Sequence, residues 1–137
     1  MSGGQAPKLT ILLVDDYEDA RFILRRFLES HGYRVVEATN GQEGVEMAQS
    51  HCPDLILMDL NMPVVDGLVA AERIRASGDS CQDVPIIAIT AFDTYGMKEA
   101  ALEAGCNGYI AKPIDFDRAE RLVRHTLDKY YAASSHN

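Results

Sequence analysis

The feature that most constrains the fold is an unbroken apolar run, Leu-Ile-Leu-Met at residues 55–58, with a carboxylate directly after it. Pro53 precedes the run, and a loop containing Pro63 and Gly67 follows it. A short segment that is apolar at every position is typical of a strand covered on both faces rather than of a surface helix. We therefore expect a buried strand with Asp59 at its carboxyl end, where open α/β sheets bind ligands.

Four other segments are also predicted to be strands, at residues 9–14, 33–38, 84–89 and 108–111. The runs at 9–14 and 84–89 are rich in apolar and β-branched residues, which favours strands. The residues of interest follow three of these segments: Asp15 and Asp16 after the first, Thr90 after 84–89, and Lys112 after 108–111.

The segments between these strands carry apolar residues at three- and four-residue steps, the pattern of amphipathic helices. We expect helices near residues 20–31, 41–51, 67–75, 94–105 and 116–130. The expected caps are Asn40 in a capping box with Glu43, Asp66, Asp93 or Thr94, and Asp115. Gly32 is expected to end the first helix, and Gly96 to weaken the first turn of the fourth.

Five alternations of strand and helix predict a parallel sheet with helices on both faces. The expected architecture is a flavodoxin-like, doubly wound α/β fold with five strands in the order 2-1-3-4-5 and five helices. The first and third strands are neighbours in that order, so the polar residues at the strand ends converge in one crevice.

Such a crevice has a definite chemistry. Its three carboxylates repel one another and need a positive charge among them. All-oxygen ligands favour Mg²⁺, which binds through one or two carboxylates together with phosphate oxygens. Lys112 offers a charge to a phosphoryl oxygen, and the hydroxyl of Thr90 offers a donor. A carboxylate nucleophile in these surroundings predicts a phosphoryl-transfer site.

Composition narrows the class of protein. The length of 137 residues suits one domain, and the formal charge of −8 argues against direct nucleic-acid binding. Cys52, Cys81 and Cys106 lack the spacing of a metal site or a redox motif, so we expect three reduced thiols. The sequence shows no signal peptide and no run long enough to span a membrane, which predicts a cytoplasmic protein without membrane insertion.

Five motifs together resemble receiver domains of two-component response regulators. They are Val14-Asp15-Asp16, residues 58–63 with Asp66-Gly67, Thr90-Ala91, Gly108-Tyr109 and Lys112-Pro113. The resemblance covers about residues 9–131 and leaves residues 1–8 and 132–137 as expected flexible ends.

The resemblance implies a role for each site residue. Asp59 is the expected phosphoacceptor. The expected ligands of Mg²⁺, with Mn²⁺ as an alternative, are Asp15, Asp16, Asp59 and the backbone carbonyl of Asn61. The residues expected to bind the phosphoryl group or to switch with it are Thr90, Ala91, Tyr109 and Lys112. The Lys112–Pro113 bond is expected to be cis.

The implied function is a single-domain signalling switch that is not a turnover enzyme. A histidine kinase or histidine phosphotransfer protein would phosphorylate it, and the face of the fourth helix, fifth strand and fifth helix would then bind a downstream protein. The chain is expected to be a monomer or a weak phosphorylation-dependent dimer.

Two alternatives belong to other classes. A Mg²⁺-dependent phosphatase would use the same aspartyl-phosphate chemistry, but the sequence has no insertion large enough for a substrate-covering cap. A binding module independent of phosphorylation is disfavoured because every residue of the acceptor site is present.

Overall fold

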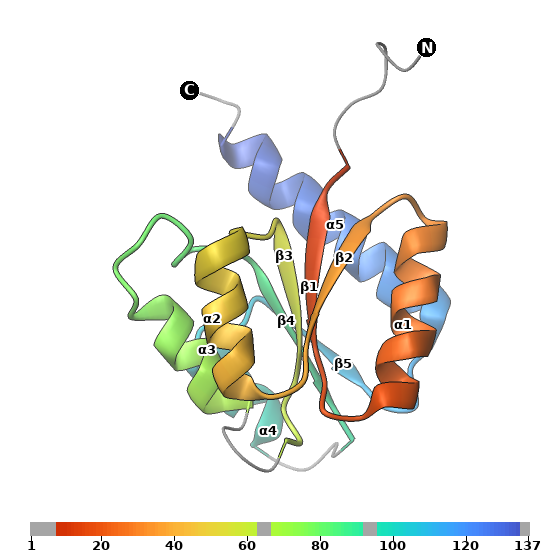
Figure 1. Ribbon diagram of the computed structural model, residues 1–137, viewed down its shortest axis with the longest axis horizontal. Coiled ribbons are helices and arrows are strands. Elements are labelled where there is room, and N and C mark those ends of the chain that lie inside the picture. The colour runs from red at the N-terminus through yellow and green to blue at the C-terminus, as the bar shows by residue number, and fades with distance from the viewer. Residues whose placement is uncertain (1–7, 63–66, 92–95, 135–137) are drawn as a thin grey trace.

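Five parallel strands form one sheet in the computed structural model, which describes residues 8–62, 67–91 and 96–134 (Figure 1). The strands are β1 (Thr10–Val14), β2 (Arg34–Ala38), β3 (Leu55–Asp59), β4 (Ile86–Thr90) and β5 (Gly108–Ala111). They lie in the order β2-β1-β3-β4-β5, and every neighbouring pair is parallel. The flavodoxin-like order predicted from the sequence is confirmed.

Helices cover both faces of this sheet (Figure 1). They are α1 (Glu18–Ser30), α2 (Gly41–His51), α3 (Gly67–Arg75), α4 (Met97–Glu103) and α5 (Phe116–Ser134). Side chains of α1 and α5 pack on one face, and those of α2, α3 and α4 pack on the other. Because both faces are covered, all residues of β3 and β4 are buried, which explains why every residue before the last one of each strand is apolar.

Two of the expected helix caps are present. The Asn40 side chain accepts a hydrogen bond from the Glu43 N–H at 2.8 Å, and Asp115 accepts one from the Arg118 N–H at 3.2 Å. The Glu43 carboxylate accepts from the backbone N–H of Thr39, so the capping box closes one residue earlier than its usual form. Asp66, Asp93 and Thr94 lie outside the described residues.

Two details of the helices differ from expectation. Gly96 precedes the first residue of α4 and has a φ of 90°, so it stands at the helix boundary and not within the first turn. Its left-handed backbone is one that glycine adopts without a steric cost. The last helix continues to Ser134, beyond its expected end near residue 130 and into the segment 132–137 that is expected to be a flexible end. Within the described residues, no helix combines the length and the apolarity that crossing a bilayer requires.

The prediction of three reduced thiols is wrong for two of them. Cys52 and Cys81 form a disulfide with a Cα–Cα distance of 5.4 Å, and Cys106 is free and buried. The partners are 29 residues apart and are brought together only because α2 and the loop after α3 end at the same edge of the sheet. No spacing motif reveals a contact of that kind.

Gly67 generates a test of the packing between β3 and α3. A Cβ atom at this position would lie 2.5 Å from the carbonyl oxygen of Asp59 and 2.8 Å from the Cα of Leu60. These are backbone atoms with little freedom to move. We expect Gly67→Ala to lower the free energy of unfolding by about 1–3 kcal/mol, measured by urea denaturation.

Gly44→Ala is the matched control, because Gly44 is also helical. Its Cβ would meet only methyl groups of Val14, at 3.1 Å, and the better helix propensity of alanine, worth up to about 1 kcal/mol, offsets that contact. Equal losses of stability in the two variants would contradict this interpretation.

Candidate functional site

Three carboxylates meet at the carboxyl edge of the sheet. Asp15 directly follows β1, Asp59 is the last residue of β3, and these two strands are neighbours. One oxygen from each of Asp15, Asp16 and Asp59 can be chosen so that all three lie within 4.8 Å of one another. Asp15 and Asp59 are almost fully buried, whereas Asp16 is exposed. The convergence expected from the strand order is therefore present.

Both carboxylate oxygens of Asp59 have a hydrogen-bond donor. The backbone N–H of Asn61 donates to Oδ1 at 2.8 Å, and the Lys112 ammonium lies 3.3 Å from Oδ2. Lys112 reaches it from the end of β5, and its own N–H donates to the Thr90 carbonyl at 2.8 Å. The Lys112–Pro113 peptide bond is cis, as expected. Asp59 is thus oriented by two donors, one of which is a cation.

Asp15 has the unusual electrostatics that such crowding produces. Its pKa is raised from 3.8 to about 6, chiefly by burial and further by the nearby Asp59, while the hydrogen bond from the Tyr17 N–H and the charge of Lys112 lower it. The Tyr17 N–H donates to Asp15 Oδ1 at 2.9 Å. The raised pKa means that the negative charge of Asp15 is incompletely compensated by its surroundings. A divalent cation among the three carboxylates would supply the compensating positive charge. The donor set is all oxygen, which suits Mg²⁺.

The side chain of Asn61 links the loop after β3 to the end of β4. Its Oδ1 accepts from the Thr90 hydroxyl at 3.2 Å and from the Ala91 N–H at 2.8 Å. Thr90 is completely buried, and Ala91 is exposed beside it. Sequence reasoning assigned only the backbone carbonyl of Asn61 a role and missed this bridge. An amide two residues after Asp59 is the only signal that could have suggested it.

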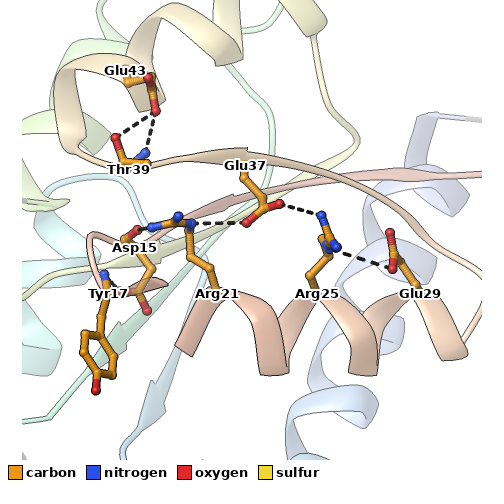
Figure 2. A network of polar contacts seen from close by, with 8 residues as sticks. All are labelled: Asp15, Tyr17, Arg21, Arg25, Glu29, Glu37, Thr39 and Glu43. Atoms are coloured by element: carbon orange, nitrogen blue, oxygen red, sulfur yellow. Dashed lines mark hydrogen bonds and ion pairs between the residues drawn. The ribbon is translucent and has the colours of Figure 1, made fainter. Parts of the chain in front are cut away.

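A network of arginine and glutamate side chains supports the loop that carries Asp15 (Figure 2). Arg21 donates to the Asp15 carbonyl at 2.9 Å and to Glu37 at 3.1 Å, and Arg25 donates to the other oxygen of Glu37 at 3.0 Å. By helical periodicity alone, these arginines would lie on the solvated side of an amphipathic helix. Arg21 nevertheless has only 13% of its side chain exposed, and the register that pairs Leu13 with Glu37 gives it a half-buried partner.

Tyr109 is the other residue that is expected to switch with the phosphoryl group. It is half-buried on β5, beside Ala88 of β4, and it helps to line a hollow of about 470 Å³ between α4, β5 and α5. Leu102 of α4, with 51% of its surface exposed, lines the same hollow. Tyr109 therefore faces the surface that the resemblance associates with output.

Known proteins match this chain in both sequence and fold. Residues 11–124 match the family described as response regulator receiver domain. The polar-differentiation response regulator DivK of Brucella anthropi is 37% identical over 118 residues, which cover 86% of this chain and 95% of DivK.

Two solved structures extend the match to three dimensions. The receiver domain of the sensor histidine kinase PA1611 from Pseudomonas aeruginosa has a magnesium ion coordinated in its active-site cleft. Its TM-score is 0.81 at 37% identity, with 88% of this chain and 98% of that one covered. The chemotaxis protein CheY4 of Vibrio cholerae has a TM-score of 0.81 at 27% identity, with 87% and 98% covered.

The pKa of Asp15 generates a test on the metal-free protein. Asn keeps the shape of the side chain and removes its charge. The free energy of unfolding of Asp15→Asn at pH 8 is therefore expected to exceed that of the wild type by roughly 1–3 kcal/mol. The folded pKa of about 6 lies above the ordinary value of 3.8 for an aspartate, so protonation of Asp15 stabilises the native state. The advantage of Asn is therefore largest above pH 6 and shrinks as the pH falls through that value.

Urea denaturation in chelator at pH 8 and pH 5 measures this difference. Asp16→Asn is the control, because Asp16 is exposed and its neutralisation should change stability little at either pH. If Asp15→Asn is no more stable than the wild type at pH 8, the charge of Asp15 is not a cost in the folded state.

Proposed function

Because the chain belongs to the family of response regulator receiver domains, we propose that it is a phosphorylation-dependent signalling switch with Asp59 as its phosphoacceptor. The strongest support is the setting of Asp59, which is buried at a strand end, 3.3 Å from Lys112 and within a cluster of carboxylates. The phosphoryl donor in this proposal is a phosphohistidine of a histidine kinase or histidine phosphotransfer protein.

The proposed metal site consists of Asp15, Asp16, Asp59 and the backbone carbonyl of Asn61. The crowding of three carboxylates and the raised pKa of Asp15 favour a divalent cation there, and the Pseudomonas receiver domain holds magnesium in its own cleft. Mg²⁺, or Mn²⁺ in its place, would neutralise charge on the phosphoryl oxygens when bound. Asp16, the exposed member of the cluster, would be the ligand that solvent reaches first.

The proposed transfer needs little rearrangement of the protein. An oxygen of Asp59 attacks the phosphorus, the phosphorus–nitrogen bond of the donor breaks, and the donor imidazole takes up a proton as it leaves. Lys112 then exchanges its contact with Asp59 Oδ2 for a phosphoryl oxygen. The methyl group of Ala91 leaves room beside the acceptor, and the N–H of the same residue fixes the loop through Asn61.

The proposal is for an acceptor and not for a turnover enzyme. A Mg²⁺-dependent phosphatase acting on small phosphoesters remains the alternative from another class, and multiple turnover with such a substrate would identify it. The proposed receiver unit spans residues 9–131 and works in the cytoplasm, as a monomer or as a weak dimer that phosphorylation favours.

Labelling of Asp59 is the first test of this function. A small phosphodonor is expected to add one phosphoryl group in the presence of Mg²⁺ or Mn²⁺ and none in chelator, because the uncompensated carboxylates repel an anionic donor. Asp59→Asn is expected to reduce labelling to background, as measured by intact mass spectrometry. Asp83→Asn is the control, because Asp83 is an exposed aspartate near the opposite end of β4. Labelling that persists in Asp59→Asn or in chelator would refute the assignment.

The proposed output surface comprises α4, β5 and α5. The Thr90 hydroxyl now donates to Asn61, and a phosphoryl oxygen on Asp59 would offer it a stronger, charge-assisted partner. Movement of Thr90 toward Asp59 would leave space into which Tyr109 can turn. The hollow lined by Tyr109 and Leu102 would change shape, and a downstream protein that reads this face would respond.

Hydrogen exchange tests that route. Beryllofluoride with Mg²⁺, a phosphoryl mimic, is expected to change exchange rates in α4 and β5 by roughly tenfold, equivalent to about 1.4 kcal/mol. Thr90→Ala and Tyr109→Ala should each remove most of this change while still binding the mimic. Thr39→Ala is the control, because Thr39 pairs with Glu43 instead. If both variants keep the full change, the signal leaves by another face, and the Arg21 and Arg25 side of α1 is the next candidate.

A further inference from the structure

The disulfide lies at the edge of the sheet opposite the carboxylates. Cys52 follows the last residue of α2 and precedes β3, and Cys81 lies in the loop that precedes β4. Both sulfur atoms are therefore near the amino ends of strands whose carboxyl ends carry Asp59 and Thr90. None of the acceptor chemistry proposed above uses this pair.

The two cysteines differ in exposure. Cys52 is exposed, and Cys81 is buried with 5% of its surface accessible. We therefore expect an external thiol or disulfide to reach Cys52 more readily than Cys81, which the surrounding protein shields. Such a difference in exposure is typical of a pair in which one cysteine reacts with an external disulfide and the other, the resolving cysteine, then displaces the external group.

The turn that carries Cys81 is held by contacts that do not depend on the disulfide. Its N–H donates to Asp79 Oδ1 at 2.8 Å, and Arg75 donates to the carbonyl of Gln82 at 2.7 Å. Arg75 is anchored in turn by the Gly105 carbonyl, at 3.0 Å from Nε and 2.8 Å from Nη2. Cys81 is thus expected to keep its position when the bond to Cys52 is broken.

The backbone of Cys52 is held less favourably. Its φ of 44° lies in the left-handed region, which a residue with a Cβ atom adopts at a cost. Its N–H donates to the Ala48 carbonyl at 3.1 Å, and the disulfide supplies the second restraint. Reduction would release that restraint and allow Cys52 to leave the conformation, while Cys81 waits in place for the bond to form again.

We propose that Cys52 and Cys81 form a reversible thiol–disulfide site, in which Cys52 exchanges with small thiols and Cys81 resolves the mixed disulfide. Its oxidation state sets the stability of the segment formed by β3 and α3. The closed loop contains all of β3 and α3, so the bond restricts the unfolded chain across both elements. In a reducing compartment the open form would predominate, and oxidation would close the clamp.

The exchange balances with a low-molecular-weight disulfide such as oxidised glutathione. The Cys52 thiolate attacks one sulfur of the small disulfide, whose other half leaves as a thiol, and a mixed disulfide remains on Cys52. The Cys81 thiolate then attacks the Cys52 sulfur and releases the second small thiol. Two protein thiols are oxidised, the small disulfide is reduced to two thiols, and these take up the two protons. Excess small thiol reverses both steps.

Glutathione redox buffers applied to the full chain test the proposal. Thiol alkylation and mass spectrometry should show two protected cysteines in oxidised buffer and none in reduced buffer. The melting temperature should fall by roughly 10 °C on reduction. Cys106→Ala, which keeps the pair, should show the same shift. Three alkylatable thiols in oxidised buffer, or an equal melting temperature in both buffers, would overturn the proposal.

The two single variants separate an exchange site from a purely structural bond. With oxidised glutathione, Cys81→Ala is expected to accumulate one glutathione on Cys52, because no resolving thiol remains. Cys52→Ala should accumulate little, because Cys81 is shielded. Equal adducts in the two variants, or none in either, would refute the assigned roles. The redox measurements do not involve Asp59, so they test this proposal even if Asp59 is not the phosphoacceptor. Mg²⁺-dependent labelling of Asp59 should be the same in both redox states.

Discussion

Asp15 and Asp59 place two carboxylates side by side where almost no solvent reaches them, and the surrounding structure compensates for that cost. Backbone N–H groups of Tyr17 and Asn61 each donate to one of these carboxylates, and Lys112 adds a positive charge beside Asp59. The compensation is incomplete, since the pKa of Asp15 stays near 6. The remaining uncompensated negative charge would attract a divalent cation to this edge of the sheet. The bound cation would in turn favour a phosphoryl group there.

The rest of the fold keeps these groups in register. Strands buried on both faces leave their carboxyl ends as the places where polar side chains converge, and the order β2-β1-β3-β4-β5 brings β1 and β3 together. Asn61 ties the end of β3 to Thr90, and Arg21 with Glu37 holds the loop after β1. The Asn61 side chain therefore offers a route from the loop after Asp59 to the end of β4, and for this reason we assign output to Thr90 and its neighbours.

The fold could be predicted from hydrophobic periodicity, which is a property of local sequence. The meeting of the strand-end carboxylates, lysine and threonine could be predicted from one topological rule, the order of the strands. Three features depended on distant contacts instead. The sequence around Arg21 does not distinguish it from a surface arginine, because its partner Glu37 lies on β2. The contact of the Asn61 side chain is likewise with a distant residue, at the end of β4. Cys52 and Cys81 meet across 29 residues, so their pairing could not be read from spacing.

Calorimetric titration with Mg²⁺ tests the central claim most directly, namely that uncompensated negative charge defines this site. One ion is expected to bind per chain. Asp15→Asn should weaken binding roughly tenfold or more, because it removes a ligand charge, and Lys112→Met should tighten it, because the competing cation 3.3 Å from Asp59 is gone. Opposite shifts in the two variants would support the electrostatic explanation. Affinity that neither substitution changes would contradict it.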